Sequence, residues 1–250
     1  MTAVAEAHRW RGPVMLLAGL FLGWHLLYTV IGEVALRSPV QTFSYLLFLL
    51  RQPSFWPHLV ETLRAFGAAL AIAVACGLAL GFALGVSQFL RQAFEPMLVA
   101  LYSIPKVTLY PIVLLIFGLG LSAKVAFGAI HGFVPIALFT INAVRNVKPV
   151  FLKTGRVMKL TPLQFVRKIL FPAALPEIFT GLRLGFALTL IGTVLGEMFA
   201  SQRGLGYMLM SAIGLHNVDV IMAVTLLMVS FAAIVSSVLL AVDRRLHARV

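Results

Sequence analysis

Ionisable and strongly polar side chains inside apolar runs mark the positions at which this sequence could do chemistry. Lys106 follows Pro105 within residues 96–119, and Asn142 and Glu197 stand in two later apolar runs. Such groups are costly inside a bilayer, and they mark the paths of substrates or ions. Pro105 also removes a backbone donor and breaks a helix, which is tolerated where the backbone lines a cavity. We therefore predict that Pro105, Lys106, Asn142 and Glu197 line a path through a membrane.

Two of these residues have simpler interpretations, which the sequence leaves open. Lys106 fits equally well as an interfacial lysine whose ammonium group extends to the cytoplasmic surface. Glu197 fits equally well as the ion-pair partner of a nearby base, either Arg203 or Lys124.

Patterns for catalysis and metal binding do not stand out in the sequence. Its one cysteine, Cys76, forms neither an intramolecular disulfide nor a zinc site by itself. His131 has no second histidine or cysteine near it in sequence, so we interpret it as a hydrogen-bonded core residue. The sequence has no phosphate-binding loop and no Ser-His-Asp or H-E-x-x-H pattern. We predict no catalytic, cofactor-binding or metal-binding residue on this chain.

The composition indicates which elements must position the polar residues. Of the 250 residues, 61% are hydrophobic and only 11% are charged, and the mean hydropathy is +1.01. Soluble domains carry roughly 25% charged residues, so most of this surface must face lipid. The net charge of +12 does not indicate nucleic acid, because the basic residues lie between apolar runs. The predicted fold class is an all-α, polytopic membrane helix bundle.

Apolar runs long enough to span a bilayer, about 20 residues each, predict six transmembrane helices. They are residues 13–32, 65–87, 96–119, 123–144, 176–198 and 220–242. The first run is longer than the apolar part of a signal peptide, so we interpret it as a retained helix. Phe43–Leu50 is too short to span and is placed at the interface. With the N-terminus inside, inner segments hold thirteen basic residues and outer segments four, which predicts that both termini are cytoplasmic.

Two further patterns concern packing and partners. Gly77, Gly81 and Gly85 recur every four residues on one helix face, which favours a close helix–helix contact, either sliding or simply packed. Residues 145–171 hold seven basic and no acidic residues, with apolar residues three or four apart. Thr161 and Pro162 are typical of a helix start. This segment predicts a cytoplasmic helix–turn–helix, which binds either a partner protein or anionic lipid head groups.

Three stretches, in order and at matching spacing, resemble the inner-membrane permeases of bacterial binding-protein-dependent ABC importers, within them the nitrate/sulfonate/taurine group. The stretches are Ser103–Val107 with Pro111 and Phe117–Gly120; Ile169–Pro176 with Gly181–Arg183; and Gly196–Met198 with Gly204–Tyr207. The resemblance covers roughly residues 58–245. It implies a type I ABC importer permease architecture, with residues 1–57 forming an N-terminal transmembrane helix plus an interfacial segment and residues 58–245 forming the permease core.

The resemblance also implies roles for particular residues. Residues 145–171 become a coupling loop that inserts a helix into a cleft on an ATPase subunit. Its candidate residues are Lys153, Thr154, Gly155, Lys159, Leu160, Thr161, Pro162, Pro172 and Pro176. The candidate outer-gate residues are Gly204, Gly206 and Tyr207. In the family the loop begins Glu-Ala-Ala, which falls on Lys153-Thr154-Gly155, and a later glycine falls on Lys159. Either the residue of the ATPase that contacts the family's glutamate differs in this system, or this chain pairs with a second permease that keeps the Glu-Ala-Ala motif.

The function implied by the resemblance is the transmembrane subunit of an importer for a small anionic or heterocyclic solute. The implied partners are ATP-binding subunits that hold ATP and Mg, a periplasmic or lipid-anchored substrate-binding protein, and a second permease copy, identical or different. The implied location is the bacterial inner membrane. An ion-coupled secondary transporter would need several acidic groups in mid-membrane, and only Glu197 is present. A membrane-embedded enzyme would need a polar cluster at one interface, which the sequence does not indicate.

Overall fold

The computed structural model describes residues 2–247, and their side chains except those of residues 2–11, 13, 14, 152, 156, 162 and 200. The described chain is built from helices and contains no strand. The helices are α1 (Thr2–Ile31), α2 (Pro39–Arg51), α3 (Trp56–Val86), α4 (Gln88–Ser103), α5 (Tyr110–Phe117), α6 (Leu121–Arg145), α7 (Pro149–Val157), α8 (Pro162–Phe165), α9 (Phe171–Ala200), α10 (Leu205–Gly214) and α11 (Val218–His247). The chain divides into two compact units, Met1–Trp56 with Met208–Ser230 and Pro57–Tyr207 with Phe231–Val250.

Four of the described helices are long and apolar enough to cross a membrane: Trp56–Val86, Leu121–Arg145, Leu163–Phe199 and Val218–His247. They contain the predicted spans 123–144, 176–198 and 220–242, and all of the predicted span 65–87 except its last residue. The first predicted span falls in α1, whose described apolar part is Met15–Ile31. The predicted interfacial segment Phe43–Leu50 falls within α2.

The third predicted span, residues 96–119, is sharply bent in the structure. α4 begins at Gln88 and ends at Ser103, and a 3₁₀ turn over Lys106–Leu109 leads into α5. The two parts are bent by 95°. Pro105 has no N–H to continue the helix, and it disfavours helical backbone at the residue before it. The predicted break at Pro105 is thus confirmed, and the run 96–119 is divided between α4 and α5 at this bend.

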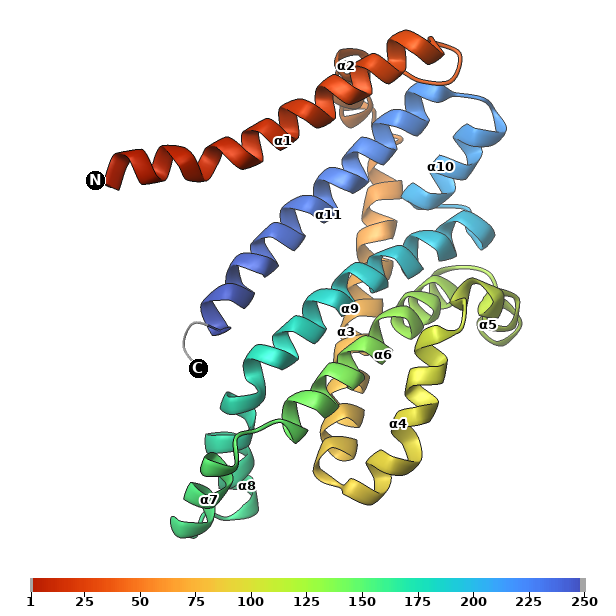
Figure 1. Ribbon diagram of the computed structural model, residues 1–250. Helices are drawn as coiled ribbons and strands as arrows, with labels where there is room; N and C mark the ends of the chain where they lie inside the picture. Colours follow the sequence, from red (N-terminus) through yellow and green to blue (C-terminus); the bar gives the residue numbers. More distant parts are fainter. Residues whose placement is uncertain (1, 248–250) are drawn as a thin grey trace. The chain divides into compact units, whose positions relative to one another are not determined.

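The larger unit is organised around α6 and α9, which run side by side with α3 behind them (Figure 1). The glycine face of α3 lies directly against α6. A Cβ added at Gly77 would come within 2.7 Å of Ile136, and one added at Gly85 would come within 2.7 Å of Val144. At Gly81, between them, it would overlap Thr140. The predicted close contact is therefore confirmed, and its partner is α6.

A second close contact joins α6 to α9. A Cβ at Gly132 of α6 would overlap the Thr189 hydroxyl and come within 3.0 Å of the Gly185 carbonyl oxygen. The same atom would lie 3.2 Å from Ala73 of α3. Three helices thus meet at one glycine, and bulkier residues there would separate them.

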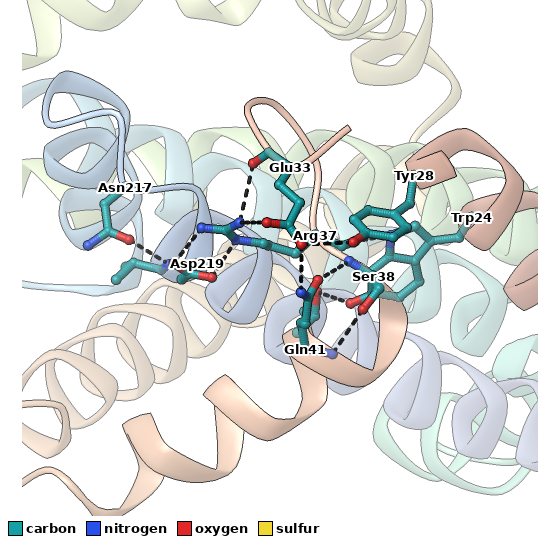
Figure 2. Close-up of polar contacts among 10 residues, drawn as sticks. Trp24, Tyr28, Glu33, Arg37, Ser38, Gln41, Asn217 and Asp219 are labelled. Atoms are coloured by element: carbon teal, nitrogen blue, oxygen red, sulfur yellow. Dashed lines mark hydrogen bonds and ion pairs between the residues drawn. The ribbon is translucent and has the colours of Figure 1, made fainter. Parts of the chain in front are cut away.

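Within the smaller unit, a polar network surrounds Arg37, which lies in the loop after α1 (Figure 2). Its guanidinium donates two hydrogen bonds to Asp219 at the start of α11, with N–O distances of 2.6 and 3.0 Å. Its carbonyl oxygen accepts a bond from the Trp24 indole at 3.0 Å. The hydrogen bond to Asp219 raises the pKa of Arg37. Loop, α1 and α11 are therefore joined through one side chain and its backbone.

Replacing Arg37 with methionine is expected to destabilise this unit by about 1 kcal/mol, because a partly buried, bidentate pair is worth more than an exposed one. A double-mutant cycle with Asp219→Asn, read by thermal unfolding of the full chain, measures the coupling. Arg51→Met at the exposed end of α2 is the control and should change little. Equal losses at Arg37 and Arg51, with no coupling to Asp219, would contradict the assignment.

Candidate functional site

Glu197 lies near the C-terminal end of α9 and is completely buried. Its carboxyl group accepts a hydrogen bond from the Thr62 hydroxyl of α3 at 2.8 Å and one from the Gly206 N–H at 3.0 Å. The Thr62 hydroxyl in turn accepts the Leu205 N–H at 2.8 Å. A carboxylate at the start of a helix is favoured by the exposed N–H groups and the helix dipole. Glu197 and Thr62 therefore hold the first residues of α10 against α3 and α9.

Gly204 allows this arrangement for two reasons. Its φ of +125° lies in a region that side chains rarely adopt, and a Cβ there would overlap the Glu197 carboxyl group. Its N–H donates to Nδ1 of His58 at 3.2 Å, and the His58 ring stacks on Tyr207. The predicted outer-gate residues Gly204, Gly206 and Tyr207 are thus brought together with Glu197 in one tightly bonded turn.

Two expectations for Glu197 are corrected by this geometry. Its side chain has no exposed surface, so in this structure it does not line a path. It is also not hydrogen-bonded to Lys124 or Arg203. Lys124 instead donates to Glu61 of α3 at 2.7 Å and to the Arg203 carbonyl oxygen at 3.0 Å.

The Lys124–Glu61 pair belongs to a site that the sequence did not predict. Lys124 is buried, with 1% of its side chain exposed, whereas 23% of the Glu61 side chain is exposed. Both residues line a cavity of about 510 Å³ together with the turn at Ser201–Arg203 and Gly120. The two residues are 63 positions apart, and only the packing of α3 against α6 brings them together.

The predicted path residues do not form one cluster. Lys106 lies at the bend after Pro105, where its ammonium donates to the Tyr102 carbonyl oxygen at 3.1 Å. Pro105 is exposed and Lys106 half-buried. Asn142 is half-buried near the other end of α6, 18 residues from Lys124, which is about 27 Å along the helix. Lys106 and Pro105 thus remain together, while Asn142 and Glu197 lie at opposite ends of the bundle.

The basic segment 145–171 forms a helical hairpin of α7 and α8, which confirms the predicted helix–turn–helix. Thr161 caps α8 as expected: its hydroxyl accepts the Gln164 N–H at 3.4 Å, and its N–H donates to the Gln164 side chain at 3.1 Å. The backbone of Pro162 starts α8, and its side chain lies outside the described residues. α8 then continues through a π-helical turn, Val166–Leu170, into α9. The hairpin is therefore an extension of a membrane helix.

Individual hairpin residues have distinct positions. Gly155 of α7 is buried, and a Cβ there would come within 2.7 Å of the Phe165 ring of α8. Lys159 turns the chain with a φ of +48°, which a glycine adopts at no steric cost. Lys153 and Thr154 are exposed, and Leu160 is half-buried in the turn. Further along, Pro172 is exposed in the first turn of α9 and Pro176 is buried within it.

Comparison with known proteins identifies the same family that the sequence motifs resemble. The family model for the inner-membrane component of binding-protein-dependent transport systems matches residues 73–250. The riboflavin transport system permease protein RibX of Chloroflexus aurantiacus is 36% identical over 84% of this chain and 78% of its own length. The taurine transport system permease protein TauC of Escherichia coli is 28% identical over 95% of this chain and 92% of its own.

The fold agrees with the sequence comparison. A structure of the MetNI methionine ABC transporter matches 78% of this chain and 98% of its own with a TM-score of 0.69, at 22% identity. This is the architecture of a type I ABC importer permease. In such systems ATP is hydrolysed on separate subunits, and the permease is a transport subunit. The chain belongs to the family of inner-membrane components of binding-protein-dependent transport systems.

Proposed function

We propose that this chain forms half of the path by which a small anionic or heterocyclic solute enters the cell. A binding protein delivers the solute on the outer face, a second permease copy supplies the other half, and ATP-binding subunits holding ATP and Mg engage the α7–α8 hairpin. Both termini lie in the cytoplasm in this proposal, supported by the distribution of basic residues. The solute class rests on relatives named for riboflavin and taurine, and half-buried Lys106 at the bend suits an anion.

One observation carries the mechanism: α8, the second helix of the hairpin, and the fifth span form one helix, Leu163–Phe199, of 37 residues. At 1.5 Å per residue it is about 55 Å long. Its far end carries Glu197 and thereby the start of α10. Closure of the ATP-binding subunits would move the hairpin, and a continuous helix transmits that movement to the outer end. The close glycine contacts of α6 with α3 and α9 keep the three helices moving as one body.

The direct test of this assignment is co-purification of the chain with the ATP-binding subunit of its importer from solubilised membranes. We expect the intact chain to retain an ATPase that carries a phosphate-binding loop. Replacing residues 150–165 by a neutral linker of equal length should abolish that association. A second permease retained in the complex would establish a heterodimer. A chain that purifies alone, in both forms, would contradict the proposal.

A further inference from the structure

The α7–α8 hairpin extends beyond the inner end of the fifth predicted span, residues 176–198. Leu163 lies 13 residues before Pro176 on the same helix, Leu163–Phe199, which is about 20 Å along the helix at 1.5 Å per residue. The interfacial layer on one side of a bilayer is about 5–8 Å thick. With the predicted span in the bilayer, the hairpin therefore reaches past the head groups, where a partner protein can contact it.

The hairpin nevertheless has an apolar surface that needs a partner. Val157 is 82% exposed, Met158 63% and Leu163 77%, and all three lie at the turn between α7 and α8. The hairpin's own core is already formed, because Gly155 packs against Phe165. An exposed apolar cluster at the end of a rigid projection indicates a protein-binding surface rather than an unfinished core.

The charge around this apolar cluster has one sign. Lys153 and Lys159 are exposed on either side of Val157 and Met158, and residues 145–171 contain no acidic residue. Among the described side chains, the ion pairs of this protein involve neither lysine. Lys159 also holds a left-handed backbone, so a charged side chain occupies a position where glycine would be relaxed. Charges of one sign that are unpaired in the free surface select a partner of opposite sign.

We propose that the hairpin docks into a cleft of the ATP-binding subunit that has an apolar floor and an acidic rim. Val157, Met158 and Leu163 enter the floor, and Lys153 and Lys159 face carboxylates on the rim. This inference rests on the proposed function, which supplies the ATP-binding subunit as the partner. It adds the chemistry that decides which ATPase this chain accepts, since a cleft with a basic rim would repel the hairpin.

The test measures the affinity of the full chain, in nanodiscs, for the purified ATP-binding subunit of its importer at several salt concentrations. The affinity of the unmodified chain should fall as salt is added, whereas the double variant Lys153→Glu/Lys159→Glu should bind at least tenfold more weakly at low salt and gain affinity as salt screens the repulsion. The matched control is Arg244→Glu/Arg245→Glu, which makes the same charge change at exposed positions of α11 and should bind normally. A compensating acidic-to-basic change on the cleft rim should restore binding to the double variant.

Three outcomes would overturn the inference. If the lysine variant binds normally while the neutral 150–165 linker abolishes binding, the hairpin docks on the ATP-binding subunit, but the proposal that its lysines face an acidic rim is wrong. If the linker also binds normally, the proposed function itself fails. The third outcome is strong quenching by brominated phosphatidylglycerol of a fluorophore on Met158→Cys, in a Cys76→Ser background, which would place the hairpin on lipid. We expect no quenching.

Discussion

Gly81→Ala is expected to destabilise the folded chain by about 1–3 kcal/mol, the cost of overpacking a well-filled interior. The added methyl group would overlap Thr140 and come within 2.9 Å of the Ala137 carbonyl oxygen of α6. Those atoms belong to the helix backbone or are attached directly to it, so α3 and α6 must separate. The measurement is the thermal unfolding midpoint of the detergent-solubilised chain.

Gly67→Ala is the matched control for this prediction. Gly67 lies in the same helix, and a Cβ there meets nothing within 4 Å. Both variants gain the same helix propensity, about 1 kcal/mol, so their difference isolates the contact with α6. Gly67→Ala should be neutral or stabilising. Equal midpoints for the two variants would show that α3 and α6 do not pack as described.

Glu197→Ala is expected to cost about 3 kcal/mol, because it leaves buried donors of Thr62 and Gly206 without their acceptor. The start of α10 should loosen, which hydrogen exchange of residues 201–207 would detect. Glu197→Gln retains one acceptor oxygen and should lose less. Thr62→Ser keeps the hydroxyl and should resemble the unmodified chain, whereas Thr62→Val should resemble Glu197→Ala.

The same variants separate a structural Glu197 from one that contacts the solute. A solute contact would change the apparent KM for uptake while leaving stability and exchange at 201–207 unchanged. We expect the opposite result: the variants lose stability, and those that still fold keep an unchanged KM. A KM change in Glu197→Gln without loss of stability would return Glu197 to the path.

The membrane helices and the hairpin could be predicted because their signals are local. Apolar run length marks the spans, the Thr161–Pro162 start marks α8, and the repeat of Gly77, Gly81 and Gly85 marks a contact face. The signal for the bend at Pro105 was also local, but local sequence does not determine the angle of the bend. Whether two halves of an apolar run continue straight or turn by 95° depends on what they pack against.

The carboxylates were misplaced because their partners are distant in sequence. Glu197 is hydrogen-bonded to Thr62, which is 135 residues away. Lys124 is hydrogen-bonded to Glu61, which is 63 residues away. The sequence instead suggested either Arg203, six residues away, or Lys124, at the outer end of its own predicted span, as the base paired with Glu197. The general rule that an ionisable group in a span lines a path also failed for Glu197. Its buried carboxyl group instead accepts a hydrogen bond from the start of α10.

In the proposed mechanism, the hairpin couples ATP hydrolysis to the movement of solute through this chain. This coupling can be measured in vesicles that contain the chain with its ATP-binding subunits, and the binding protein carrying its own solute on the outer face. We predict that solute crosses only when ATP is supplied, and that a neutral linker in place of residues 150–165 abolishes this uptake. Uptake that proceeds without ATP, is driven by an ion gradient, and survives the linker would contradict this mechanism and establish a secondary transporter.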